Sequence, residues 1–161
     1  MQGVKSPDEL TEAFRRQGLK VTPQRQAIFR ALHENPEHPT AESVYDTVRA
    51  DMPTISLRTV YQTLNDLAAM GELQQLSFGP GSARFDPNGD DHHHLVCESC
   101  GKVVDVYADT SAVQLAPAAR HGFTLTTTQV VFRGRCADCS TSGHPDQPTN
   151  PTNHQEETIH A

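Results

Sequence analysis

Three aspartates, three consecutive histidines and a Cys-x-x-Cys pair lie within residues 85–100, which read FDPNGDDHHHLVCESC. Thiolate is a soft ligand that favours zinc in a closed structural site, whereas imidazole and carboxylate together suit exchangeable first-row ions. One short stretch therefore combines two kinds of ligand chemistry. We interpret it as contributing to two metal sites with different tasks.

The four cysteines of the chain form two Cys-x-x-Cys pairs, Cys97/Cys100 and Cys136/Cys139. A structural zinc site takes four ligands in a tetrahedron, and four thiolates satisfy it. Paired spacing argues against ordinary buried cysteines, and a thioredoxin-like redox motif would lie beside a βαβ pattern that this sequence lacks. We therefore predict that structural Zn²⁺ binds all four cysteines and stabilises a carboxyl half that is poor in core residues.

The histidines follow a different pattern. On a strand, alternate side chains point to one face, so His92 and His94 can chelate one ion while His93 points away. Asp86 precedes these histidines and Asp105 follows the first cysteine pair, and both add oxygen donors. A mixed nitrogen and oxygen set suits Fe(II), Mn(II), Ni(II) or Zn(II).

His38 lies in the segment NPEHPTAES, in a loop of the amino-terminal half. If His38 joins the second site, one ion would connect the two halves of the chain, and its loss would free them. The competing interpretation is that the histidine run is a solvated loop with incidental histidines.

Composition limits the architecture. The chain has 161 residues, of which 35% are hydrophobic and none is Trp, so one domain or two small ones are expected. The net charge of −7 does not indicate a basic nucleic-acid footprint for the whole molecule, although residues 1–80 are close to neutral and could carry a local basic face. No apolar run is long enough to span a membrane. We expect a soluble, cytoplasmic protein, where paired cysteines favour zinc over disulfides.

Helix signals dominate the first seventy residues. Four N-caps are predicted, at Ser6, Thr22, Thr40 and Ser56. The last helix should end at Gly71 and bury the stripe Val60, Leu64, Leu67 and Ala68. Two short strands around GPGS follow, and helices followed by a β-hairpin suggest a winged helix-turn-helix.

The opposite face of that last helix carries polar residues suited to base edges in a major groove. They are Arg58, Thr59, Tyr61, Gln62 and Asn65. Arg25 is a candidate phosphate contact. The competing interpretation for each is a solvated helix face.

The second half is predicted to be rich in strands, in HLVC, KVVDVYA and FTLTTTQVVFRGRC, with a helix over residues 110–121 in which Pro117 is unfavourable. We expect an α+β protein with a DNA-binding domain at 1–84, a hinge at 85–90, a metal-binding domain at 91–140 and a disordered tail at 141–161.

The segments GLKVTPQRQAIFRAL, HPTAESVY, SLRTVYQTLNDLAAMGEL and HHHLVCESCGKVVDV closely resemble the ferric uptake regulator (Fur) superfamily over about residues 5–140. The resemblance implies a homodimeric, metal-dependent transcriptional repressor and not an enzyme. It implies a winged-helix domain, a small α/β dimerisation domain with the four-cysteine zinc, and palindromic operator DNA as partner. The regulatory metal site of the family falls on His38, Asp86, His92, His94 and Asp105.

Aspartate at positions 86 and 105 resembles the peroxide-sensing (PerR/CatR) branch, because the iron-sensing branch generally has glutamate there. That resemblance implies regulatory Fe²⁺ or Mn²⁺, with His38 and His92 as the side chains that hydrogen peroxide oxidises to relieve repression. Iron-, zinc- or nickel-sensing repressors of the same superfamily are the alternatives. Outside it, a metalloenzyme and a zinc-ribbon interaction module remain as rival classes.

Overall fold

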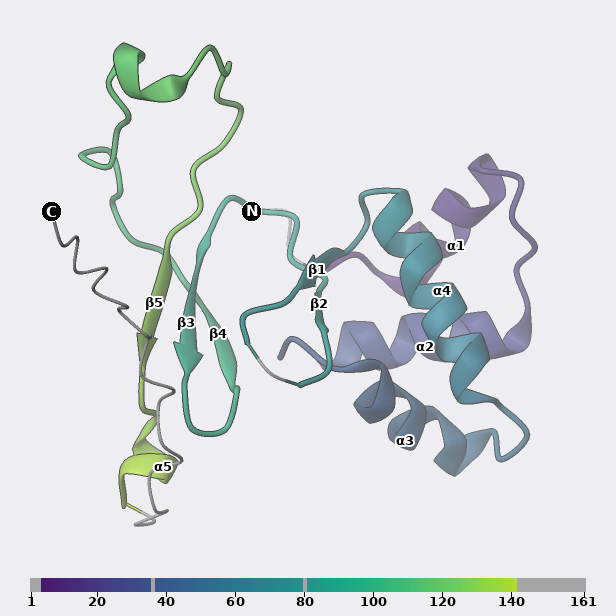
Figure 1. Cartoon of the computed structure of the whole chain (residues 1–161). Coiled ribbons are helices and arrows are strands. Elements are labelled where there is room, and N and C mark those ends of the chain that lie inside the picture. Colours follow the sequence, from purple (N-terminus) through teal and green to yellow (C-terminus); the bar gives the residue numbers. More distant parts are fainter. Residues whose placement is uncertain (1–3, 36, 80, 142–161) are drawn as a thin grey trace, which may run out of the picture.

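The computed structural model describes residues 4–35, 37–79 and 81–141, which form a helical lobe and a sheet lobe with a β-hairpin between them (Figure 1). The helical lobe contains α1 (Pro7–Arg16), α2 (Pro23–Glu34), α3 (Ala41–Asp51) and α4 (Leu57–Ala69). The hairpin pairs β1 (Gln74–Leu76) with β2 (Arg84–Asp86). The sheet lobe contains β3 (His93–Cys97), β4 (Val103–Val106), the 3₁₀ turn η1 (Pro117–Arg120), β5 (Val131–Gly134) and α5 (Ala137–Thr141).

All four expected N-caps are confirmed. At α1, Ser6 Oγ accepts the Glu9 N–H while the Glu9 carboxylate accepts the Ser6 N–H, which is a complete capping box. The side chains of Thr22, Thr40 and Ser56 each accept a backbone N–H from the first turn of the following helix. Gly71 adopts φ 75° directly after α4, and this left-handed conformation ends the helix as predicted.

The core of the helical lobe is built from the buried stripes of its helices and is closed by the hairpin. Phe14 and Phe29 meet edge to face with ring centroids 5.0 Å apart. Leu73 and Phe85 extend from the hairpin region into the same core. Burying a large apolar side chain contributes about 1.5–3 kcal/mol, so these two residues anchor the hairpin to the helices.

The sheet has the strand order β4-β3-β5, with β3 antiparallel to β4 and parallel to β5. A small apolar cluster joins it to the hairpin. Leu76 of β1 packs with Val96 and Val103 of the sheet, and the partly buried Phe78 and Val131 pack against these three residues. The two lobes therefore touch through the hairpin, at a contact that is small compared with the helical core.

Two expectations for the sheet lobe were wrong in extent. Within residues 110–121 the structure has only the single 3₁₀ turn Pro117–Arg120, because Pro117 has no N–H to donate and starts a helix only at its first turn. Of FTLTTTQVVFRGRC, only Val131–Gly134 forms a strand, since only these residues have a partner strand, β3. The tail at 142–161 lies outside the described residues. Among the helices described, none has the length and apolarity to cross a membrane.

Candidate metal centres

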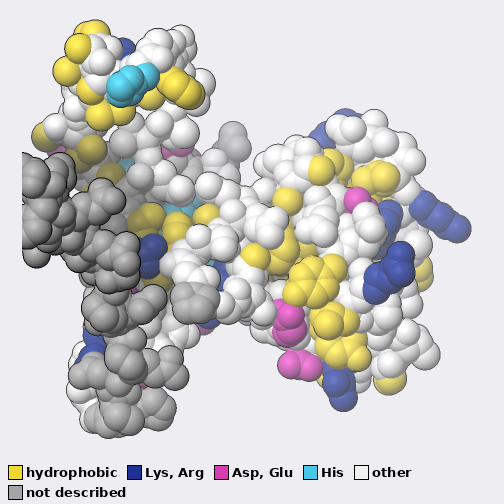
Figure 2. Space-filling view, viewed as in Figure 1, with side chains coloured by type: hydrophobic (Ala, Val, Ile, Leu, Met, Phe, Trp, Pro, Cys, Tyr) yellow, Lys and Arg dark blue, Asp and Glu magenta, His cyan; other side chains and the backbone are white. Residues whose placement is uncertain are grey.

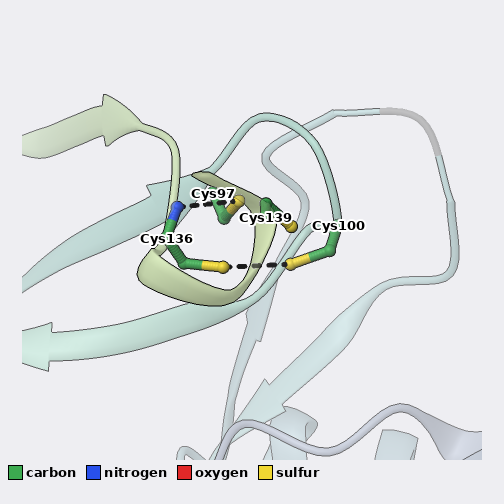
Figure 3. A group of neighbouring side chains, drawn as sticks. All are labelled: Cys97, Cys100, Cys136 and Cys139. Atoms are coloured by element: carbon green, nitrogen blue, oxygen red, sulfur yellow. Dashed lines mark hydrogen bonds between the residues drawn. The ribbon is translucent and has the colours of Figure 1, made fainter. Parts of the chain in front are cut away.

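The four cysteine sulfurs come together at the far end of the sheet lobe, with every pair within 4.8 Å (Figure 3). The parallel register of β3 and β5 places Cys97 opposite Gly134, so that Cys136 arrives beside Cys97 two residues later. The Cys136 N–H donates to Cys97 Sγ over 3.3 Å. Cys139 follows on the short helix α5, and none of the four forms a disulfide.

This geometry fits tetrahedral zinc. Sulfurs bound at about 2.3 Å to a tetrahedral ion lie about 3.8 Å apart, and Cys100 Sγ and Cys136 Sγ are separated by 3.8 Å. Backbone N–H groups of Cys136 and Cys100 lower the pKa of Cys97 to about 6, which favours the thiolate that zinc requires. Hydrogen bonding with the Cys136 and Cys100 sulfurs raises the pKa of Cys139 to about 12, so zinc would have to displace its proton.

A second cluster lies where the hairpin meets the sheet and contains all five residues of the predicted regulatory site. One donor atom from each of His38, Asp86, His92, His94 and Asp105 lies within 4.8 Å of all the others. Four of these residues are buried, and Asp105 is half-buried.

Backbone contacts bring His38 to this cluster from the helical lobe. The Phe85 N–H of β2 donates to the Pro39 carbonyl over 2.9 Å, and an isolated bridge pairs Thr40 with Arg84. Arg84 Nη1 donates to the His38 carbonyl over 3.0 Å. The loop that carries His38 is therefore attached to the strand that ends at Asp86.

The β3–β4 register brings in two of the remaining candidate ligands, His94 and Asp105. His94 pairs directly with Asp105 across the two strands, and His92 precedes β3 by one residue. His93 points away, as expected: its Nε2 lies 3.0 Å from Thr110 Oγ1, and its Nδ1 accepts the Val130 N–H. Alternation of side chains along the strand thus directs His92 and His94 into the cluster and His93 to the other face.

The spacing of the donor atoms suits an ion with five or six ligands. Donors bound at about 2.1 Å in adjacent positions lie about 3.0 Å apart. His92 Nε2 is 2.8 Å from Asp86 Oδ2 and 3.1 Å from His94 Nε2. Asp105 Oδ1 lies 3.2 Å from His92 Nε2. The cluster is compact enough for all of these atoms to share one ion.

The hydrogen bonding provides an independent test of this fit. His38 Nε2 lies 2.7 Å from Asp105 Oδ1, yet both atoms are buried without a hydrogen-bond partner of acceptable geometry. Buried polar atoms are normally paired, because leaving one unpaired costs about 1–3 kcal/mol. A metal ion bound by both atoms would satisfy them.

Groups outside the cluster orient two of the imidazoles, and sequence reasoning missed both. His92 Nδ1 lies 2.6 Å from the Asp90 carbonyl, which can only accept, so Nδ1 is the donor of this bond and Nε2 is the nitrogen that faces the cluster. The side-chain amide of Gln129 lies 3.2 Å from His94 Nδ1. The proximity of Asp90 was visible in the sequence, whereas Gln129 approaches only because β5 pairs with β3.

Neighbouring charges and burial shift the pKa values of Asp86 and His38 in opposite directions. Burial disfavours ionisation of Asp86, but the His38 imidazole and the Asn88 N–H outweigh it and lower the pKa of Asp86 to about 2. Burial disfavours the charged form of His38, yet Asp86 and Asp105 outweigh it and raise the pKa of His38. Burial lowers the pKa of His94. Asp86 is therefore ionised, and a cation entering the cluster would displace any proton on His38.

The predicted DNA-facing residues lie mostly on the outer surface of α4. Arg58, Tyr61, Gln62 and Asn65 are exposed and Thr59 is half-buried. Tyr61 donates to Glu42 Oε1 of α3 over 2.6 Å. Arg25 lies elsewhere: it pairs with Asp66 over 3.1 Å and stacks on the Phe14 ring, so it joins α2 to α4 and α1. Its phosphate contact stays a prediction.

Comparisons with known proteins agree with this architecture. The profile of the ferric uptake regulator family matches residues 16–133. The peroxide-responsive repressor PerR of Staphylococcus aureus is 35% identical over 133 residues, which are 82% of this chain and 90% of that protein. The structure of the ferric uptake regulator Fur of Helicobacter pylori has a TM-score of 0.72 at 19% identity and covers 89% of this chain and 100% of its own. A zinc-bound manganese uptake regulator has a TM-score of 0.64 at 28% identity, and the match covers 79% of this chain and 98% of that chain.

The profile covers most of the chain, and the alignment with PerR covers 82% of this chain and 90% of that protein. The chain therefore belongs to the ferric uptake regulator family, whose members are metal-responsive transcriptional regulators and not enzymes.

Proposed function

We propose that this protein is a homodimeric repressor that binds palindromic operator DNA in the cytoplasm when its His/Asp cluster holds Fe²⁺ or Mn²⁺, and releases it after exposure to peroxide. The observation that carries the proposal is that the ligand set spans both lobes. His38 belongs to the helical lobe, Asp86 ends the hairpin, and the other three ligands belong to the sheet lobe. Zn²⁺ on the four cysteines is the structural ion in this proposal.

An ion bound by residues of both lobes would act as the switch between DNA-binding and free states. The apolar contact between hairpin and sheet is small, so the lobes have few interactions that hold one relative orientation. An ion bound by His38 together with Asp105 would add direct bonds across this junction and favour one orientation. Loss of a ligand would return the lobes to a wider range of orientations, in which two DNA-binding units no longer match a palindrome.

The helical lobe is the DNA-binding unit in this proposal, with α4 as the recognition helix and the β1–β2 hairpin as the wing. On α4, Arg58, Tyr61, Gln62 and Asn65 are exposed on the side opposite the stripe that packs into the core. Several Lys and Arg side chains line the outer side of this lobe, away from the sheet (Figure 2). Local positive charge of this kind supports phosphate contacts despite the acidic net charge.

The sheet lobe is the dimerisation unit. Leu95 of β3 pairs in register with Val104 of β4 and with Phe132 of β5, so these three side chains form one row across the sheet. They are 44%, 42% and 41% exposed. A contiguous apolar row on a sheet marks an interface, and a second copy presenting the same row would bury it symmetrically.

Two observations favour peroxide as the signal. Both carboxylates of the cluster are aspartates, and the peroxide-responsive repressor PerR is 35% identical to this chain. Bound Fe(II) would activate hydrogen peroxide so that one oxygen atom is added to an imidazole carbon and the other leaves as water. His38 and His92 are the proposed acceptors. An oxidised imidazole binds metal poorly, and loss of either side chain would remove one ligand from a set of five.

The test is to fill the cysteine site with zinc, load the protein anaerobically with Fe(II), and add a small amount of hydrogen peroxide. Trypsin cleavage after Arg and Lys yields peptides 31–49 and 85–102, which contain the two proposed acceptors. Addition of a single oxygen to His38 or His92, in step with loss of operator binding, is the expected result. Protein loaded with Mn(II) is the control and should keep both peptides unmodified.

An unmodified pair of peptides from Fe(II)-loaded protein would exclude peroxide sensing. Titrating operator binding with iron, manganese, zinc and nickel would then identify the ion that the regulator reads. Operator binding that is independent of every metal would reject the proposed switch as a whole.

A further inference from the structure

Asn88 hydrogen-bonds to two of the five candidate ligands and is linked to a third, His92, through Asp90. Its backbone N–H donates to Asp86 Oδ1 over 2.8 Å, and its side-chain Nδ2 donates to Asp105 Oδ2 over 2.6 Å. Its Oδ1 accepts the Asp90 N–H over 3.1 Å, and the Asp90 carbonyl in turn lies 2.6 Å from His92 Nδ1. Asn88 thus hydrogen-bonds to both carboxylates of the cluster.

These contacts divide the two oxygens of each carboxylate between different partners. Asp86 uses Oδ1 for Asn88 and presents Oδ2 to the imidazoles. Asp105 uses Oδ2 for Asn88 and presents Oδ1 to His38. An unrestrained carboxylate can bind a cation through one oxygen or through both. With one oxygen occupied by an N–H donor, each aspartate supplies a single donor atom.

We propose that Asn88 is a positioning residue that restrains Asp105 to one-oxygen ligation and so keeps the metal site at five protein donors. Three nitrogens and two oxygens fill five positions around an ion that takes six, and the sixth stays open to a small molecule. If Asn88 Nδ2 is removed, Asp105 Oδ2 is free to turn and fill that position. This inference rests on the proposed function of the His/Asp cluster.

A purely structural role for Asn88 is the competing explanation, because its Oδ1 also holds the turn that leads to His92. Two variants separate the roles. Asn88→Ala removes both the acceptor and the donor. Asn88→Asp keeps an acceptor for the Asp90 N–H but lacks the donor to Asp105. Tyr107→Phe is the matched control, since Tyr107 Oη is the second partner of Asn88 Nδ2 and lies 2.9 Å from it.

The experiment fills the cysteine site with zinc in the full-length wild type and the three variants, and then titrates each with Co(II). The visible absorption of Co(II) is strong in low-symmetry five-coordinate sites and weak in six-coordinate ones. We expect Asn88→Ala and Asn88→Asp to weaken this band, and Tyr107→Phe to retain it. A second readout is histidine oxidation in the Fe(II) forms, which should fall about 10- to 100-fold in both Asn88 variants, as for other groups that orient metal ligands.

Zinc content and thermal unfolding establish that each variant is folded. Wild-type absorption in both Asn88 variants would overturn the proposal, and so would an equal loss in Tyr107→Phe. A failure of the proposed function is distinguishable from these results. In that case the wild type itself, with its cysteine site filled by zinc, would show no visible Co(II) absorption.

Discussion

His38 Nε2 lies 2.7 Å from Asp105 Oδ1, although one residue belongs to the helical lobe and the other to the sheet. Neither atom has a hydrogen-bond partner of acceptable geometry, and both are buried. Burial of unpaired polar atoms is unfavourable unless another interaction compensates for their lost hydration. An ion between these atoms would provide that interaction and would connect the lobes at the same time.

Replacing His38 by Ala should uncouple the lobes without unfolding either one. We expect metal affinity at the His/Asp cluster to fall at least tenfold, because one of five donors is lost, and metal-dependent operator binding to disappear. Isothermal titration with Mn(II) and an operator-shift assay would measure the two effects. His33→Ala is the control, since His33 is exposed on the same lobe. Unchanged metal affinity in His38→Ala would exclude His38 as a ligand.

Zinc at the cysteine site should be needed for the sheet lobe to fold. Cys97→Ser removes one sulfur from the cluster and should strongly reduce bound zinc, because a structural site needs all four ligands. The sheet lobe should lose stability with the metal, because zinc binding contributes free energy to folding. Zinc analysis and thermal unfolding would show this loss. Ser99→Ala alters an exposed residue in the same turn and should retain the metal. A zinc-free Cys97→Ser protein that unfolds at the wild-type temperature would contradict a structural role.

The apolar row across the sheet should hold the dimer together. Leu95→Glu places a charge at its centre, between Val104 and Phe132, and should shift the protein to monomer because burying an unpaired carboxylate is unfavourable. Sedimentation velocity would report the mass. Leu57→Glu makes the same change at an exposed position of the helical lobe and should leave the dimer intact. A Leu95→Glu protein that remains dimeric would place the interface elsewhere.

Arg58 should contribute to operator binding without affecting the metal. Arg58→Ala removes an exposed guanidinium from α4, and we expect a loss of about 1–3 kcal/mol in operator binding if it contacts a base. Lys102→Ala removes one exposed positive charge from the sheet lobe and controls for net charge. Equal weakening by the two variants would indicate a long-range charge effect and argue against a direct contact. Mn(II) affinity should stay at the wild-type value in both.

Much of the helical lobe was predictable because its signals are local. A cap such as Ser6 or Thr40 acts on N–H groups three residues away, and the stripe on α4 repeats with the helical period, so both can be identified from neighbouring residues alone. Local signals also misled: residues 110–121 contain helix-forming residues, but the single proline restricts them to one 3₁₀ turn.

Residue types and spacing by themselves determined the ligand chemistry of this protein. Paired thiolates indicated a four-sulfur site, and alternation along one strand separated His92 and His94 from His93. Only the tertiary structure decided which ligands meet. His38 reaches the cluster because its loop pairs with β2, and Asn88 restrains Asp105 because the β3–β4 register brings Asp105 beside His94. Such contacts depend on chain segments far apart in sequence, and no local propensity encodes the distance between them.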